Sequence, residues 1–191
     1  MKLLSNVKSY LNQNIAIKFA ITFIGLFLIF YYFNVYFFGL TSVGNHYNSF
    51  LDQHLNYISW LRWLLLNTSA GILNFIGFAA IVNKYELLVS GHGAIRLIYT
   101  CLGLGVMSFF VAFVIAYPKK LKSKLIFLIT GLLTIQLLNI IRLMLIALYW
   151  NRDRERVIDH HTIFNLFIYI IIAVALYFWV NSKSNSPHAS N

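Results

Sequence analysis

Long apolar segments separated by short polar ones recur through this chain and limit what it can fold into. They lie at about residues 15–38, 60–82, 101–117, 125–150 and 160–180. A helix crosses a bilayer with about 20 predominantly apolar residues, and these segments fall near that length. Hydrophobic residues make up 60% of the chain and charged residues only 10%, a balance that excludes a soluble domain of this size. We therefore predict an all-α polytopic membrane protein.

The amino-terminal apolar segment is predicted to be a membrane span and not a removable signal sequence. It is too long for the apolar region of a secretory signal, and it lacks a small-residue cleavage pattern. Residues 1–18 are polar and contain three lysines, so they are expected to form a cytoplasmic amino terminus. We expect residues 1–191 to form a single membrane domain, with a helical bundle at 19–180, its first span at 19–38, and a disordered polar tail at 181–191.

Residues 60–82 decide the orientation of everything that follows them. The segment is long enough to span the membrane, but polar residues and glycines interrupt it. Lysines are concentrated at 118–124, so the positive-inside rule places that loop in the cytoplasm. The helix that begins at Cys101 then runs inward and Cys101 lies outside, which requires that 60–82 does not cross. We favour a re-entrant or interfacial helix there and four true spans; five spans with an extracytoplasmic amino terminus remain the alternative.

A small extracytoplasmic β-hairpin is predicted immediately before Cys101. Residues 85–90 and 94–99 are rich in β-branched and aromatic residues, and they flank a glycine-rich turn at 91–93. The simplest role of this hairpin is that of a connector into the Cys101 helix.

Cys101 is the only cysteine of the chain, which excludes an internal disulfide and a cysteine-based metal site. In a helix that starts at Cys101, the residue shares one face with small residues further along (Gly105, Ser108 and Ala112). Small residues let helix backbones approach closely inside a membrane. A lone cysteine in a membrane helix is commonly a packing residue, so its chemistry depends on what other segments bring to it. We expect no metal and no cofactor.

A polar stripe crosses the apolar segment at 125–150. Its members, Gln136, Asn139 and Arg142, fall within about 120° of one another around a helix. Arg142 lies about 12 Å along the axis from Trp150, in the outer half of the span. Two interpretations remain: Arg142 snorkels to the membrane surface without further function, or the stripe faces an internal site.

The last apolar segment begins with two adjacent histidines. His161 shares its helix face with Asn165, whereas His160 shares its face with phenylalanines. Asp159 stands where it can cap the start of this helix. A histidine that begins a polar face is the better candidate for the bundle interior, so we favour His161 and keep His160 as the alternative.

Under the preferred orientation Cys101, Arg142 and His161 come from three helices and reach the same outer leaflet. Such a set suits nucleophilic acyl transfer, because a nearby cation or a helix start lowers the pKa of a thiol. His161 would take the thiol proton and return it to the leaving amine, and Asp159 is close enough in sequence to orient a histidine. Arg142 would stabilise the thiolate, or else the developing oxyanion.

These residues resemble the exosortase/archaeosortase membrane transpeptidases, in their compact bacterial form. That family has a cysteine that opens a helix after a short hairpin, Asn-x-x-Arg in the next span and a histidine at the start of the last helix. Here these motifs are Cys101 in Tyr-Thr-Cys-Leu-Gly-Leu, Asn139-Ile-Ile-Arg142, and His160-His161 before Asn165. The resemblance covers about residues 85–180, the expected catalytic half. Many members have Gly or Asn directly after the cysteine, whereas this chain has Leu there and Gly one place later.

The resemblance implies an intramembrane cysteine transpeptidase of the bacterial inner membrane, with its active site on the extracytoplasmic face. Its substrates would be surface proteins that end in a sorting signal, made of a short motif, a transmembrane helix and a basic cluster. Cys101 would cleave near the motif through a thioester, and an acceptor molecule at the membrane would resolve it.

The alternative is a non-enzymatic membrane component, such as a small transporter subunit or assembly factor, in which the polar stripe lines a path or a helix interface. The net charge of +10 lies mostly in loops and termini, where it sets orientation and lipid contact, so nucleic acid is not an expected partner. The chain has no Gly-x-Ser motif with a matching histidine and no His-Glu-x-x-His, which argues against a rhomboid-like protease and a metalloprotease.

Overall fold

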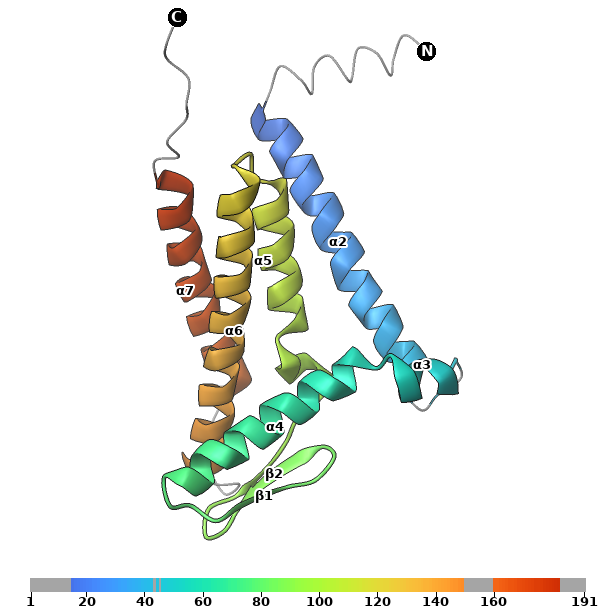
Figure 1. Cartoon of the computed structure of the whole chain (residues 1–191), viewed down its shortest axis with the longest axis vertical. Helices are drawn as coiled ribbons and strands as arrows, with labels where there is room; N and C mark the ends of the chain where they lie inside the picture. Colours follow the sequence, from blue (N-terminus) through green and yellow to red (C-terminus); the bar gives the residue numbers. More distant parts are fainter. Residues whose placement is uncertain (1–14, 43, 45, 150–159, 183–191) are drawn as a thin grey trace, which may run out of the picture.

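Helices dominate the structure, a computed structural model that describes residues 15–42, 44, 46–149 and 160–182; residues 15 and 160–165 are described by their backbone alone. Within this part, the helices along the long axis are α2 (Ile15–Thr41), α5 (Leu104–Ala116), α6 (Leu121–Tyr149) and α7 (His160–Asn181). Across one end lie the short α3 (Ser49–His54) and α4 (Tyr57–Phe75) with a three-stranded sheet (Figure 1). The strands of that sheet are β1 (Ala80–Val82), β2 (Glu86–Val89) and β3 (Ala94–Arg96).

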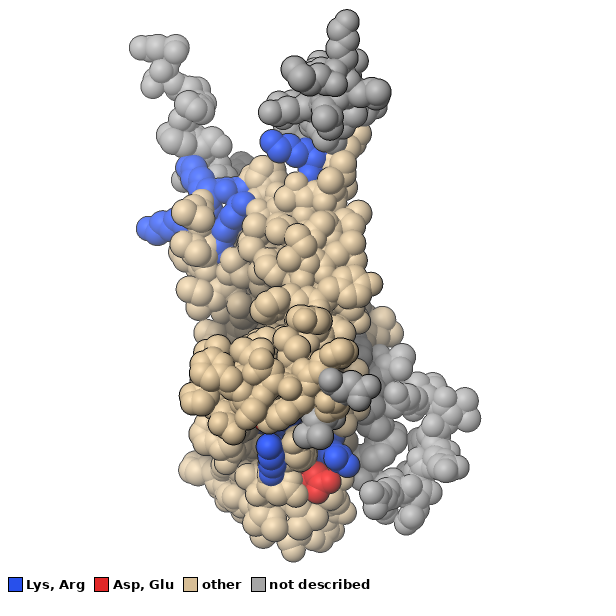
Figure 2. Space-filling view, turned by 90° about the vertical axis from the view of Figure 1, so that its right-hand side faces the viewer, with Lys and Arg blue, Asp and Glu red and all other residues tan. Residues whose placement is uncertain are grey.

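The aligned helices carry an apolar surface. By length and composition, Ala16–Thr41 and Leu121–Tyr149 can each cross a membrane, and Leu104–Ala116 and Leu166–Asn181 are shorter apolar helices. On the face shown in Figure 2, Lys and Arg gather toward the two ends and leave a band without charge between them. Such a band is the surface expected of a bundle that contacts lipid.

α2 packs against α5 through the small-residue face of α5. Gly105 faces the ring of Tyr31, and Ser108 Oγ accepts a hydrogen bond of 3.1 Å from Asn34 Nδ2. The side-chain oxygen of Asn34 in turn accepts 2.6 Å from the hydroxyl of Tyr57, so this residue joins α2, α4 and α5. Small residues were expected to allow another helix to approach closely, and at Gly105 and Ser108 that helix is α2.

The predicted helical segment at 60–82 is wrong beyond Phe75. There the chain turns at Gly77, whose φ of 96° is left-handed and suits glycine, and continues as β1. Asn74 stabilises the turn, because its side chain accepts 2.8 Å from the Ala80 amide and donates 2.9 Å to the Ala80 carbonyl. These bonds replace those that a continuing helix would have made.

The hairpin before Cys101 is present and extended by a strand that was not predicted. β2 and β3 pair antiparallel, with Leu87 opposite Ile95, and β1 pairs with the other edge of β2.

The bounds of the first helices also differ from the predicted ones. Between the first two apolar segments lie α3 and the start of α4, which are capped by the side chains of Asn48 and Asn56. The first helix, expected at 19–38, begins earlier and ends later.

α4 and the sheet share one apolar core with the segment that holds Cys101. The core includes Leu65 of α4, Leu87 of β2 and Leu143 of α6, all buried. Leu102 lies among them, directly after Cys101. The elements at this end of the bundle therefore enclose the only thiol of the chain.

Candidate active site

Cys101 lies on a short 3₁₀ helix, η1 (Tyr99–Leu102), and not on α5 as predicted. Gly103 separates the two elements, because its left-handed φ of 75° breaks the helical path. α5 then starts at Leu104, so Cys101 does not continue the small-residue face of that helix. The thiol is instead fixed by a turn, whose backbone carbonyls at 101 and 102 face α6.

Arg142 of α6 contacts the Cys101 residue directly. Its side chain is only 2% exposed, and Nη2 donates a hydrogen bond of 3.1 Å to the Cys101 carbonyl. The guanidinium also interacts with the Cys101 side chain, through its charge and through a hydrogen bond. Arg142 therefore does not snorkel to the membrane surface. It is turned inward and brings a positive charge to the thiol.

Asn139 and Gln136 complete the polar stripe beside this turn. Asn139 Nδ2 lies 3.4 Å from the Leu102 carbonyl and 3.3 Å from Gln136 Oε1, and both oxygens accept from it. The amide of Gln136 donates to the sulfur of Met107 at 2.9 Å. The stripe thus holds the backbone on both sides of the Cys101–Leu102 bond.

Gly103 is required at its position for a second reason besides its φ. A Cβ added there would lie 2.5 Å from Asn139 Nδ2, closer than a side chain can approach. The glycine that follows Leu102 in this chain therefore allows the Asn139 side chain to reach the turn. The motifs Cys-Leu-Gly and Asn-x-x-Arg therefore contact each other in the fold: Asn139 and Arg142 bond to the backbone of the turn, and Gly103 leaves room for Asn139.

The predicted histidine partner cannot be placed against this pair. His160 and His161 begin α7, but their side chains and that of Asn165 lie outside the described part of the structure, as does all of Asp159. Among the described histidines, His92 in the hairpin turn has a role that the sequence did not indicate. Its Nδ1 lies 3.1 Å from the Leu148 carbonyl, which ties the hairpin to the end of α6.

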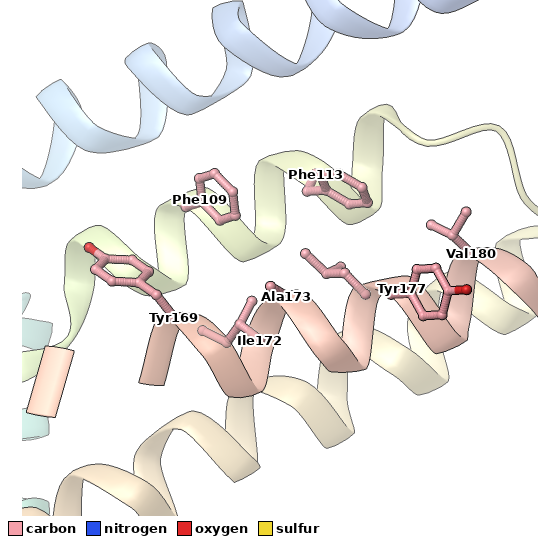
Figure 3. Close-up of a pocket in the computed structure, with 8 residues that line it drawn as sticks. Phe109, Phe113, Tyr169, Ile172, Ala173, Tyr177 and Val180 are labelled. Carbon is pink, nitrogen blue, oxygen red and sulfur yellow. The ribbon is translucent and has the colours of Figure 1, made fainter. Parts of the chain in front are cut away.

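An apolar groove with a volume of about 480 Å³ runs between α5 and α7 (Figure 3). Phe109 and Phe113 of α5 form one side of it. On the α7 side, residues such as Ile172, Ala173 and Tyr177 face α5 across the gap. The groove therefore separates the helix that follows Cys101 from the helix that begins with the two histidines.

A second buried cation, Arg62 of α4, was not among the predicted site residues. Its side chain is 7% exposed and lines a second, polar cavity at the same end of the bundle. A signal was available, since Arg62 is the only charged residue in the apolar segment 60–82.

Fold and site together define a helical protein with a buried cysteine–arginine pair at one end of an apolar bundle. A family model described as "Transmembrane exosortase (Exosortase_EpsH)" matches residues 3–178, which is most of the chain. The chain therefore belongs to the transmembrane exosortase family and is a membrane protein, which confirms the resemblance seen in its motifs. No curated protein and no solved structure matches it.

Proposed function

We propose that this protein is an intramembrane cysteine transpeptidase that cleaves the C-terminal sorting signals of surface proteins. The observation that carries the proposal is the contact between Arg142 and Cys101, a buried cation bonded to the residue that bears the only thiol. Membership of the exosortase family supports the same class of reaction. Cys101 is the proposed nucleophile, Arg142 its charged partner and His161 the proton acceptor, with His160 as the alternative.

In the proposed reaction the Cys101 thiol passes its proton to the histidine, and the thiolate attacks the carbonyl of the scissile peptide bond. A positive charge beside a thiol stabilises its thiolate form, which is the nucleophilic form. The protonated histidine then protonates the leaving amine, so that the tail departs and a thioester to Cys101 remains. An acceptor nucleophile resolves the thioester and restores the thiol. Asn139 acts as a positioning residue, since it holds the carbonyl of Leu102.

The orientation that we propose places the lysine-rich loop between α5 and α6 in the cytoplasm of a bacterial cell. α2, α5, α6 and α7 would then be four spans of the inner membrane, and α4 with the sheet would lie at the extracytoplasmic interface. The concentration of lysines at 118–124 and the uncharged band of the bundle support this arrangement (Figure 2).

The groove between α5 and α7 is the proposed site for the transmembrane segment of the sorting signal. Its walls are apolar, and it lies between the helices that follow Cys101 and the two histidines (Figure 3). A substrate helix lying there would present the preceding motif to the Cys101 end of the bundle.

The test is processing of a co-expressed surface protein that ends in a short motif, an apolar helix and a basic cluster. Cys101→Ala and Cys101→Ser are expected to abolish the shortened product on immunoblots, while expression and membrane insertion of the enzyme persist. Normal processing by Cys101→Ala would refute the proposal.

Alanine variants of the two histidines extend the same assay. His161→Ala is expected to lower the rate of substrate processing by about 10²–10⁴-fold, the typical contribution of a general acid–base group. His160→Ala should have the smaller effect, and His46→Ala, at an exposed histidine before α3, is the matched control. A larger loss for His160→Ala would transfer the role to that residue.

The burial of Cys101 favours a second candidate, the non-enzymatic membrane component. The side chain is 2% exposed, as expected of a packing residue. Labelling of intact cells with a membrane-impermeant thiol reagent at neutral pH separates the two. Selective modification of Cys101 from outside supports the enzyme, and an inert thiol together with unchanged processing in Cys101→Ala supports the component.

A further inference from the structure

Arg62 is a buried cation for which the described residues supply no acceptor. Its side chain is 7% exposed, and its Nε has no hydrogen-bond partner in the described structure. Its guanidinium carbon lies 4.8 Å from the centre of the Tyr85 ring, a cation–π contact. Burying a charge without an acceptor is costly. An arginine in this state has the donors of a ligand site, and an anion would satisfy them.

Arg62 lines a cavity with a volume of about 230 Å³ between the end of α2, the helices α3 and α4, and the chain before β2. Lys84 and Tyr85 also line it, and the Lys84 ammonium lies 5.6 Å from the same Tyr85 ring. Two cations therefore converge on one cavity. Phe38 closes it on the side of the Cys101 segment, where its ring stacks on Tyr99 with centroids 4.4 Å apart.

The carboxylate that lines the cavity is already engaged. Asp52 accepts 2.5 Å from Asn56 Nδ2 and 2.9 Å from the Tyr47 hydroxyl. These two hydrogen bonds, Asn56 first, hold the pKa of Asp52 below its usual range. Lys84 contributes more weakly through its charge. Asp52 thus lies near Lys84 but makes no ion pair with Arg62 in the described structure.

The elements around the cavity have the character of a membrane interface. α4 runs across the end of the aligned helices (Figure 1), and its Trp60 and Trp63 are 63% and 59% exposed. Phe50 of α3 and Leu55 after it are exposed as well. Exposed tryptophans and apolar residues on a helix in this position are typical of segments that lie among lipid headgroups. The anions most abundant at that depth are phosphodiesters.

We propose that the cavity at Arg62 binds the phosphate of a phospholipid headgroup. The forked donors of a guanidinium match two phosphate oxygens, and Lys84 adds a second positive charge. The acyl chains would leave toward the exposed apolar residues of α3 and α4. This site is separate from Cys101 and Arg142, neither of which lines the cavity, and the proposal does not depend on the peptidase function.

The test uses the full-length protein, stripped of lipid in detergent, titrated with short-chain dioctanoyl-phosphatidylglycerol. Binding is followed by the thermal midpoint of unfolding and by native mass spectrometry, which counts bound lipid. Arg62→Met keeps the length of the side chain and is expected to weaken binding at least tenfold. Lys84→Met is expected to weaken it about fivefold, in line with an interfacial charge contact. Arg96→Met is the matched control, because Arg96 is exposed and lies 6.0 Å from the same Tyr85 ring but outside the cavity.

A ligand role and a structural role for Arg62 predict different results without lipid. If Arg62 serves a ligand, Arg62→Met unfolds at a temperature equal to or above that of the unmodified protein in lipid-free detergent. Only the unmodified protein then gains stability from phosphatidylglycerol. If Arg62→Met cannot be purified, Arg62→Lys replaces it and is expected to bind several-fold more weakly; unchanged binding by Arg62→Lys contradicts the forked contact.

Three comparison ligands identify the source of the anion. Dioctanoylglycerol, which lacks phosphate, must not reproduce the shift; if it does, the binding is apolar and the proposal fails. Inorganic phosphate that gives the same shift at millimolar concentration would make this a site for a soluble anion. A glutamate-containing peptide that displaces the lipid would make it a peptide site. Either result overturns the assignment to phospholipid.

Discussion

Two arginines are buried at the same end of this bundle, and they differ in what surrounds them. Arg142 donates to the Cys101 carbonyl and interacts with the Cys101 side chain. Arg62 contacts an aromatic ring and has no acceptor in the described structure. Both side chains have a buried Nε that makes no hydrogen bond in the described structure. They differ because the chain supplies acceptors to the rest of the Arg142 guanidinium, at the Cys101 carbonyl and side chain, and the described residues supply none to Arg62.

The difference separates a positioning role from a binding role. A buried cation bonded to its own chain stabilises one arrangement of the backbone, here the turn that holds the thiol. A buried cation that lacks an acceptor is a cost to the folded state that an external anion can offset. This difference supports the two proposed roles, Arg142 as a partner of Cys101 in the reaction and Arg62 as a donor to a ligand from outside the chain.

The largest expected effect that tests this comparison is that of Arg142→Met. Loss of the positive charge beside Cys101 is expected to lower processing of the substrate by about 10²–10³-fold, as for other groups that stabilise charge in a reaction. The variant also leaves the Cys101 carbonyl without its donor, which costs about 1–3 kcal/mol. Processing assays and thermal unfolding in detergent measure the two effects.

The control for this prediction is Arg62→Met without phospholipid, which should not lose thermal stability. Arg142→Lys keeps the charge but not the fork, and intermediate processing is expected. Equal loss of stability in Arg142→Met and Arg62→Met would remove the distinction between the two arginines.

A smaller effect is expected at Gly103, where the precision of the Cys101 turn is tested. Gly103→Ala places a side chain in a left-handed conformation and against Asn139 Nδ2, so it should cost about 1–3 kcal/mol. Gly25→Ala in α2 is the matched control. A Cβ there meets nothing within 4 Å, and the change should stabilise that helix by up to about 1 kcal/mol.

Denaturation of both glycine variants in mild detergent gives the measurement. If Gly103→Ala is as stable as Gly25→Ala and processes substrate normally, then the turn at Cys101 tolerates movement. The contact between Asn139 and the turn would then not be needed.

The smallest effect concerns Asp52 beside the Arg62 cavity. Its pKa is lowered in the folded state by Asn56 and Tyr47, so its stabilising contribution is present above its ordinary pKa of about 4 and lost as the pH falls through the lower folded value. Asp52→Asn should therefore unfold slightly below the unmodified protein at pH 7. The difference should remain at pH 5, begin to shrink near pH 4 and vanish only when the pH is below the lowered pKa of the folded state. A difference that disappears already between pH 7 and 5 would show that another group titrates.

Much of the fold could be predicted from local patterns in the sequence. The length of the apolar segments, the glycine-rich turn at 91–93 and the spacing of Gln136, Asn139 and Arg142 each depend on residues close in the chain. Helical periodicity alone places that stripe on one face, and the hairpin follows from β-branched residues around a turn. The same reasoning could not end the helix at Phe75, because a side chain of Asn74 that bonds to Ala80 competes with the helix.

Part of the candidate site could also be predicted from local sequence motifs. Cys101 and Arg142 were paired by the order of the motifs, and the structure brings them into contact. The prediction of His161 over His160 stays a prediction, since their side chains lie outside the described residues. Arg62 was not predicted, because its role depends on whether an acceptor lies near its guanidinium in the folded chain. Residues distant in the sequence decide that.

By itself, the sequence of this protein determined that it lies in a membrane, that it belongs among the exosortases, and that one thiol and one arginine are its distinctive polar groups. Only the tertiary structure decided that Cys101 lies on a turn before α5, that α2 occupies the small-residue face, and that Arg62 lines a cavity. The physical reason is the separation along the chain of the residues that interact. Composition and periodicity are properties of short stretches, whereas the fit of Gly103 against Asn139 and the isolation of Arg62 arise between residues far apart in the chain.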